Sequence, residues 1–309
     1  MNKIGDLDVF PLCLGGNVFG WTAGKERSFE ILDAYAAAGG NFVDTSDSYM
    51  ASAPGNSGGE SETIIGEWTE TRGNRDDMVI ATKVGRHPER KGLAPANIRA
   101  AADDSLRRLR TDRIDLYYTH YDDPSVPVEE IMTTLDELVT AGKVRQIAVS
   151  NIELDRLRAS LEFSEREGTA RYTAIQPHYN LVSRDTYEGP RRDLAERHGL
   201  AALPYYALAS GFLTGKYRPG AEVDSVRAEK AARHLETERG RNVLAALDIV
   251  AEEQGTSVAT VALAWLAAQP TVAAPIASAR TLDQLPPLID AARVRLTDDQ
   301  LKRLTEASA

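Results

Sequence analysis

Short apolar segments alternate with longer amphipathic segments along the whole chain, and this alternation constrains the possible folds more than any other feature. Eight apolar segments have the length and composition of β-strands, and they lie at residues 11–15, 41–44, 78–83, 114–120, 144–150, 173–176, 200–204 and 271–276. Amphipathic spacing between them predicts helices at residues 28–38, 61–71, 95–109, 128–141 and 154–166. Such alternation favours parallel strands joined by crossover helices.

Repetition of this unit along the chain predicts a (β/α)8 TIM barrel, an α/β fold in which one domain covers residues 1–309. The alternative is an open doubly wound sheet, which usually carries Gly-x-Gly-x-x-Gly after its first strand. Residues 14–20 are rich in glycine but have a different spacing. We therefore expect the barrel, with cofactor and substrate loops at the C-terminal face of its strands. Gly168 stands where one predicted helix is expected to end.

Composition narrows the possible partners and locations. The formal net charge of −10 argues against nucleic-acid binding, which depends on basic surfaces. The single cysteine, Cys13, excludes a disulfide framework and a cysteine-cluster metal site. Residues 1–8 have no apolar core of a signal peptide, and the longest apolar run, residues 258–268, is too short to cross a bilayer. We expect a cytoplasmic protein without a metal site and without membrane or nucleic-acid partners.

Three loops are expected to border a site. Residues 51–59 are small and polar and follow the second predicted strand, and residues 210–241 are highly charged and follow the seventh. Residues 121–127 follow the fourth predicted strand. Because these loops follow the C-terminal ends of strands, they lie on the face where barrel enzymes carry their active sites.

Ionisable side chains stand where apolar strands end. Asp44 ends the second predicted strand, and Tyr49 follows five residues later. Lys83 ends the third strand and His120 the fourth. Each residue alone has a structural explanation, such as a helix cap or core packing, although burial of an unpaired lysine is costly. Since the ends of parallel strands meet at one face, we interpret the four residues together as a catalytic site.

These four side chains suit proton donation to a carbonyl oxygen. Tyr49 would be the acid, and a neighbouring Lys83 ammonium would lower the pKa of its phenol. Asp44 would pair with Lys83 and keep it charged. His120 would donate a hydrogen bond to the substrate oxygen. A tyrosine acid without a nucleophile or a metal requires an external electron source, for which nicotinamide hydride is suitable.

The chain resembles the aldo-keto reductases over nearly its whole length. The resemblance includes Asn-Phe-Val-Asp-Thr-Ser-Asp-Ser-Tyr at residues 41–49 and Gly-Glu-Ser-Glu-Thr-Ile-Ile-Gly at residues 59–66. Further matching segments are residues 80–83, 115–120, 148–151, 176–180, 208–217 and 278–280. In that family an Asp, a Tyr, a Lys and a His form the catalytic tetrad, which the resemblance places at Asp44, Tyr49, Lys83 and His120.

The resemblance also implies NADPH as cofactor, bound across the C-terminal face of the barrel. The implied cofactor-binding residues are Gly16, Asn17, Asp44, Ser150, Asn151, Gln176, Tyr205, Leu208, Ser210, Gly211, Lys216, Ser278, Arg280 and Gln284. Ser150, Asn151 and Gln176 would hold the nicotinamide, on which Tyr205 would stack.

The remaining implied contacts divide between two parts of the cofactor. The segment from Leu208 to Lys216 would follow the pyrophosphate. Ser278, Arg280 and Gln284 would meet the adenosine end, where Arg280 would distinguish the 2′-phosphate of NADPH from the hydroxyl of NADH.

The sequence departs from the family pattern at three places. Tyr206-Ala207-Leu208 replaces a common Ser-Pro-Leu, so the bend after Tyr205 is expected to differ. Residues 284–288 lack the Glu-Asn that relatives often use near the adenine. Gly16-Asn17 replaces bulkier pairs and is expected to leave more room near the nicotinamide.

Three functions therefore compete. The first is NADPH-dependent reduction of a small-molecule aldehyde, ketone or keto sugar to an alcohol, with Tyr49 as general acid. The second is an NADPH-binding redox sensor like the potassium-channel β subunits, which carry asparagine where this chain has His120. The third is a lyase that uses Lys83 as a Schiff base, which a nearby carboxylate disfavours because it keeps the amine protonated.

Overall fold

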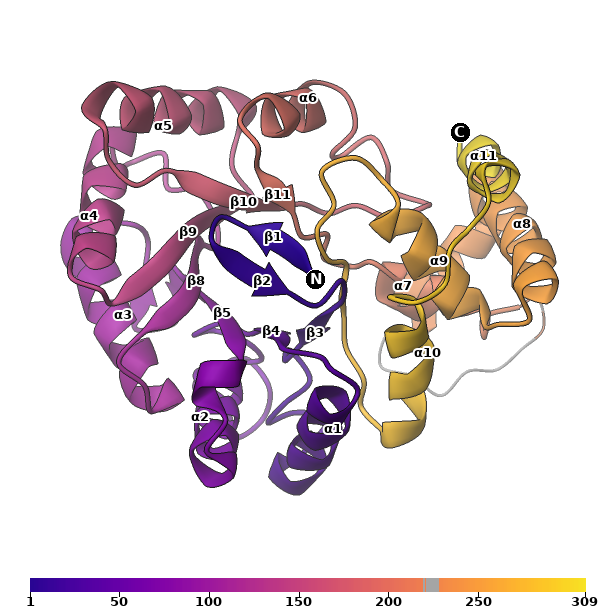
Figure 1. The fold of residues 1–309 in the computed structure, drawn as a ribbon, viewed down its shortest axis with the longest axis horizontal. Helices are drawn as coiled ribbons and strands as arrows, with labels where there is room; N and C mark the ends of the chain where they lie inside the picture. Colours follow the sequence, from indigo (N-terminus) through magenta and orange to yellow (C-terminus); the bar gives the residue numbers. More distant parts are fainter. Residues whose placement is uncertain (219, 221–227) are drawn as a thin grey trace.

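An eight-stranded parallel sheet forms the centre of the computed structural model, which describes residues 1–218, 220 and 228–309. Its strands follow one another in the order β11-β10-β9-β8-β5-β4-β3-β12. Their bounds are β3 Cys13–Gly15, β4 Phe42–Asp44, β5 Val79–Val84, β8 Ile114–Thr119, β9 Val144–Ser150, β10 Tyr172–Gln176, β11 Ala201–Ala202 and β12 Ile276–Ala277. The predicted (β/α)8 barrel is confirmed, with helices around the curled sheet (Figure 1).

Backbone hydrogen bonds join the two ends of the sheet. Ala202 bridges to Val272 in parallel, and the Ile276 amide donates to the Pro204 carbonyl at 2.9 Å. The predicted eighth strand at residues 271–276 is therefore in the right place, but its regular part is only Ile276–Ala277. Proline at position 275 has no amide hydrogen to donate to a neighbouring strand, and Thr271 has a positive φ of 69°. Both features interrupt the ladder.

A hairpin that the sequence analysis did not predict closes one end of the barrel. β1 (Asn2–Ile4) pairs with β2 (Leu7–Val9) in an antiparallel arrangement, and the hairpin lies over the barrel centre in Figure 1. Its apolar side chains Ile4, Leu7 and Val9 are buried in a cluster with side chains of the barrel interior. The hairpin seals this end, so access to the barrel interior lies at the opposite, C-terminal face.

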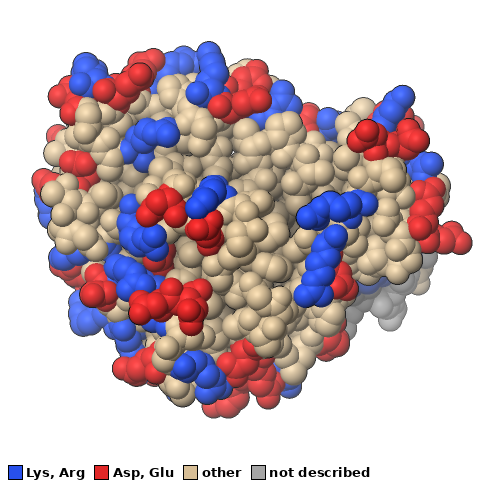
Figure 2. Space-filling model, viewed as in Figure 1, with Lys and Arg blue, Asp and Glu red and all other residues tan. Residues whose placement is uncertain are grey.

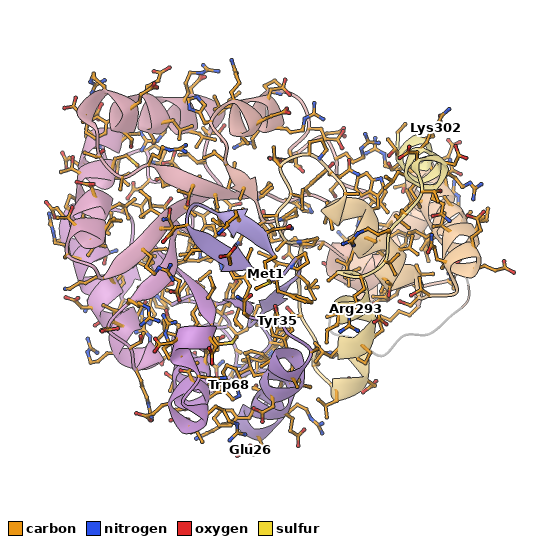
Figure 3. All side chains as sticks on the ribbon, in the orientation of Figure 1. Met1, Glu26, Tyr35, Trp68, Arg293 and Lys302 are labelled. Carbon is orange, nitrogen blue, oxygen red and sulfur yellow. The ribbon has the colours of Figure 1, made fainter. Side chains whose placement is uncertain are left out.

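The five predicted helices are present within a few residues of their expected bounds. They are α1 Lys25–Ala37, α2 Glu60–Arg72, α3 Pro95–Leu109, α4 Val128–Thr140 and α5 Leu154–Glu167. Gly168 ends α5 with a φ of 67°, a left-handed conformation that glycine adopts without strain. Tyr35 and Trp68, labelled in Figure 3, are fully buried and anchor α1 and α2.

Six further helices and several short segments complete the described chain. The remaining helices are α6 Pro190–Arg197, α7 Ala228–Ala232, α8 Glu238–Gln254, α9 Val258–Ala267, α10 Leu285–Asp290 and α11 Asp298–Ala307. The 3-10 segments are η1 Arg75–Asp77, η2 Ala209–Thr214, η3 Arg233–Glu236 and η4 Leu282–Gln284, and η2 is kinked at Ser210 and Gly211. The short strand β6 Arg86–His87 pairs with β7 Arg90–Lys91.

The segment 210–241, expected as a charged loop, contains η2, α7, η3 and the start of α8. Part of that prediction, residues 219 and 221–227, lies outside the described residues. Figure 1 shows α8 and α11 on the outside of the C-terminal part, with α9 and α10 nearer the sheet.

Charges of both signs are interspersed over the face drawn in Figure 2, without an extended basic area. No described helix combines the length and apolar character needed to cross a bilayer. Nor does the described part of the chain bring together three His, Cys, Asp or Glu side chains able to hold a metal ion.

Candidate active site

A cavity of about 610 Å³ contains most of the predicted site residues. Three of the predicted catalytic residues, Asp44, Tyr49 and His120, line it. Lys83 does not line the cavity but lies directly behind Asp44 and Tyr49. Asp44 is the last residue of β4, Lys83 belongs to β5, and His120 follows β8. The cavity therefore lies at the C-terminal ends of adjacent parallel strands, as expected.

Lys83 is fully buried and binds three neighbouring groups at once. Its Nζ lies 2.7 Å from both carboxylate oxygens of Asp44, from the Thr45 carbonyl oxygen and from the Tyr49 hydroxyl. Tyr49 in turn donates a hydrogen bond of 2.7 Å to Asp44 Oδ2. Burial of this ammonium is compensated by its carboxylate partner, and the three side chains form one rigid hydrogen-bonded unit.

The expected lowering of the Tyr49 pKa is wrong for this arrangement. Burial raises the pKa of the Tyr49 phenol well above its ordinary value, and the adjacent Asp44 carboxylate raises it further. Burial also lowers the pKa of Lys83, an effect that Asp44 opposes. The sequence indicates only the nearby ammonium, whereas in the structure the buried phenol donates a hydrogen bond to the Asp44 carboxylate. Tyr49 is therefore held as a neutral phenol.

His120 is neutral and fixed from two sides. Burial lowers the pKa of its imidazole well below the ordinary value, with further lowering by the Lys83 and Arg86 charges. Its Nδ1 lies 3.3 Å from the Ser46 hydroxyl, and its backbone carbonyl accepts a hydrogen bond from Asn151 Nδ2 at 2.9 Å. A neutral imidazole donates through one nitrogen only, so its tautomer determines what it can offer the cavity.

Three predicted nicotinamide-binding residues form a polar layer beside Asp44. Gln176 Nε2 donates to Asp44 Oδ1 at 2.9 Å, and Ser150 Oγ donates to the Gln176 carbonyl at 2.9 Å. Asn151 Nδ2 donates to Ser150 Oγ at 2.9 Å. All three line the cavity, and Asn151 has a positive φ of 47°.

Tyr205 lies against the cavity at the next strand end. Its hydroxyl donates to Asn151 Oδ1 at 3.0 Å, and its ring is stacked on His178 with 5.5 Å between the ring centres. Tyr206 has a positive φ of 54°, so the chain does turn unusually after Tyr205. Strained backbone of this kind concentrates at ligand-binding sites.

The segment predicted to follow the pyrophosphate also has an unusual backbone. Ala209, Ser210 and Gly211 have successive positive φ values of 47°, 58° and 98°. Leu208, Ser210, Gly211 and Lys216 all line the cavity. Within the described part of the chain Lys216 has no carboxylate partner, and its ammonium lies over the Tyr217 ring.

The predicted adenosine-binding residues line the other end of the cavity. Ser278 donates to Asn17 Oδ1 at 2.6 Å, and Arg280 and Gln284 are joined by a 2.9 Å bond from the Arg280 amide to Gln284 Oε1. These four residues all line the cavity. The Arg280 side chain pairs with none of the described carboxylates.

Gly16 is the one predicted cofactor residue that does not line the cavity. Its amide donates to the Asp44 carbonyl at 2.7 Å, and a Cβ at this position would lie 2.8 Å from the Ser61 hydroxyl. Gly16 itself therefore adds no room to the cavity, whereas Asn17 of the same pair lines it, and extra room near the nicotinamide stays a prediction. Glycine is needed because two segments approach closely here.

Sequence reasoning missed several residues around the site. Ser46 contacts His120, and the buried Asp47 side chain contacts Ser46. Behind them Glu62 accepts hydrogen bonds from Thr82 Oγ1 at 2.5 Å and Arg108 Nε at 2.6 Å. Ser46 and Asp47 stand within the matched segment 41–49, so their place beside Asp44 could have drawn attention to them. Nothing in the local sequence indicates the contact between Glu62 and Arg108.

A closed parallel barrel with a polar cavity at its strand ends is the architecture of a barrel enzyme. The model of the Aldo/keto reductase family matches residues 11–309. The chain therefore belongs to this family of oxidoreductases, as its resemblance had implied.

Individual relatives agree with that assignment. The chain is 33% identical to norsolorinic acid reductase of Emericella nidulans, over 99% of this chain and 80% of that protein. It is 32% identical to protein Tas of Escherichia coli, over 96% of this chain and 94% of that protein. It is 31% identical to an NADP(+) aryl-alcohol dehydrogenase of Phanerodontia chrysosporium, over 97% of this chain and 83% of that protein.

Proposed function

We propose that the protein reduces aldehydes or ketones to alcohols with NADPH and that Tyr49 is the general acid. The observation that carries this proposal is the position of the Tyr49 hydroxyl. It borders the cavity while it is hydrogen-bonded to both Lys83 and Asp44 at 2.7 Å. A neutral phenol facing a cavity, with an ammonium behind it, is suited to release a proton and to be stabilised afterwards as a phenolate.

NADPH, when bound, would supply a hydride to the carbonyl carbon. Tyr49 would give its proton to the carbonyl oxygen, and the Lys83 ammonium would stabilise the phenolate that forms. Asp44 would keep Lys83 protonated and in place. His120 would hold the same carbonyl oxygen through a hydrogen bond from its cavity-facing nitrogen.

The cavity lining suits a nicotinamide dinucleotide phosphate. The polar layer of Ser150, Asn151 and Gln176 would hold the nicotinamide carboxamide beside Tyr49. Lys216 and Arg280, which have no carboxylate partner in the described part of the chain, supply positive charge for the phosphates. This donor set favours NADPH over NADH because Arg280 would meet the 2′-phosphate.

Aromatic carbonyl compounds are the proposed substrates. Trp21, Tyr121 and Tyr206 line the cavity, and Tyr121 and Tyr206 remain 43% and 42% exposed. Aromatic walls favour flat, apolar substrates. The name of one relative, aryl-alcohol dehydrogenase, points to the same class.

NADPH oxidation measured against aromatic aldehydes, aliphatic aldehydes and keto sugars tests this proposal. We expect turnover with NADPH and the highest kcat/KM for an aromatic carbonyl compound. NADPH binding without turnover of any carbonyl would favour the redox-sensing alternative instead. Trapping of a substrate on Lys83 by borohydride would favour the lyase.

A further inference from the structure

Ser46 connects a buried carboxyl group to the imidazole of His120. Ser46 and Asp47 follow Asp44 in the loop after β4, and both are at most 1% exposed. Ser46 Oγ lies 3.3 Å from His120 Nδ1 and 3.2 Å from Asp47 Oδ1. The Ser48 amide also donates to Ser46 Oγ at 3.2 Å, and the Ser48 hydroxyl lies 3.1 Å away. Asp47, Ser46 and His120 therefore form a continuous hydrogen-bonded path from the buried carboxyl group to the cavity wall.

The hydrogen-bonding capacity of one hydroxyl restricts how this path can be arranged. Ser46 has one proton to donate and two lone pairs, of which the Ser48 amide takes one. With the Ser48 hydroxyl turned toward the Asp47 carboxyl group, the second lone pair is left for either Asp47 or His120. If Asp47 is ionised, Ser46 donates to Asp47 and accepts from His120 Nδ1–H. If Asp47 is protonated, Asp47 donates to Ser46, and Ser46 donates to an unprotonated Nδ1. Each state of Asp47 thus selects a different tautomer of the neutral imidazole.

We propose that Ser46 and Asp47 are positioning residues that set which ring nitrogen of His120 carries the proton. With Asp47 protonated, the proton is on Nε2, which is the nitrogen left for the cavity. With Asp47 ionised, the proton is on Nδ1, and Nε2 is only an acceptor. The consequence for catalysis rests on the proposed function, because only Nε2–H can donate to a carbonyl oxygen.

The path takes up one proton when Asp47 changes from its ionised to its protonated state. The proton enters from the cavity and binds Nε2, while the Nδ1 proton passes to Ser46 Oγ. The proton of Ser46 then passes to Asp47 Oδ1. No other group gains or loses a proton, so the cavity supplies the proton that neutralises Asp47.

The surroundings of Asp47 place the protonation of its carboxyl group near neutral pH. Burial raises the pKa of Asp47 from 3.8 to about 7, and the neighbouring Glu62 carboxylate adds to the rise. Hydrogen bonds from the Ser46 and Ser48 side chains oppose this rise of the Asp47 pKa, and the Arg108 charge from α3 opposes it as well. Asp47 Oδ2 has no hydrogen-bond partner in the described structure, so the ionised form is poorly solvated.

Other charged and titratable groups also face the path. Lys83 and the Tyr117 hydroxyl are electrostatically coupled to Asp47 from β5 and β8. Lys83 and Arg86 act on His120, and the rings of Tyr49 and Tyr121 lie 6.2 Å and 5.2 Å from its ring. Since burial, with the Lys83 and Arg86 charges, lowers the pKa of the imidazole and keeps it neutral, the tautomer rather than the charge of His120 responds to Asp47.

Nitrogen NMR of 15N-histidine-labelled protein tests the proposal directly, because the two ring nitrogens of each tautomer have distinct chemical shifts. The protein has five histidines, so a His120→Ala sample identifies the signal. We expect Nε2–H below about pH 7 and Nδ1–H above it. A His120 tautomer that is the same on both sides of this pH would overturn the proposal.

Two variants test whether Asp47 and Ser46 themselves cause the pH-dependent change of the His120 tautomer. In Asp47→Asn and in Ser46→Ala the tautomer of His120 should no longer change with pH. Ser160→Ala is the matched control, since the Ser160 hydroxyl donates only to the Arg156 carbonyl of its own helix, and it should retain the change. A change that persists in Asp47→Asn would also overturn the proposal. The experiment uses neither NADPH nor a carbonyl compound, so its result is independent of the proposed activity.

Discussion

The Lys83 ammonium lies 2.7 Å from the Tyr49 hydroxyl inside a barrel that leaves Lys83 no contact with solvent. Because Asp44 accepts hydrogen bonds from both side chains, the unliganded site holds Tyr49 as a phenol and Lys83 as its partner. The site is thus prepared to stabilise a phenolate without having formed one. This relationship is the basis of the proposed reduction.

Loss of Lys83 is expected to destabilise the protein. Lys83→Met leaves the buried Asp44 charge unpaired, and breaking a buried ion pair in this way costs about 3–5 kcal/mol. The double variant Lys83→Met/Asp44→Asn removes that charge and should recover part of the loss. Urea unfolding of the three proteins measures this, and equal stability of the single and double variants would contradict the pairing.

Cofactor preference is expected to depend on Arg280. Charge-assisted hydrogen bonds contribute roughly 1.5–3 kcal/mol, so NADPH should bind about ten- to a hundredfold more tightly than NADH. Arg280→Ala should remove most of this difference by weakening NADPH binding alone. Titration of both cofactors measures it, with Arg293→Ala as control because Arg293 contacts Asp290 on the surface. Equal weakening of both cofactors would show that Arg280 supports the fold.

Asp47 should make stability depend on pH. Its pKa in the folded protein is raised to about 7 from 3.8, so between these values the folded state holds a proton that the unfolded state has lost. The wild type therefore loses stability as pH rises through this window, by at most about 1.4 kcal/mol per pH unit. Asp47→Asn lacks this loss, so its free energy of unfolding relative to wild type should increase with pH. A constant difference across the window would contradict the raised pKa.

Strand ends were predictable because hydrophobic segments show where strands stop. Asp44, Lys83 and His120 were placed on one face from that signal and the barrel topology alone. The regular part of the eighth strand is shorter than predicted because Pro275 and the turn at Thr271 break a ladder that the apolar pattern suggests. Its location between neighbours was nevertheless correct.

Interactions between side chains were less predictable. The pKa of Tyr49 was expected to fall because the sequence indicates a lysine nearby but does not show that the phenol donates to Asp44. The contact between Ser46 and His120 joins positions 74 residues apart and depends on how the loop after β4 turns. Such details require the positions of atoms, which hydrophobic periodicity does not specify.

The most direct test of the proposed function is single-turnover hydride transfer from NADPH to an aromatic aldehyde in wild type and Tyr49→Phe. Phenylalanine keeps the ring but has no proton to donate, so the rate should fall by about 10²–10⁴-fold. The dissociation constant for NADPH, measured on the same samples, should be unchanged because the phenol acts on the substrate. A hydride-transfer rate in Tyr49→Phe close to that of wild type would contradict the assignment of Tyr49 as the acid.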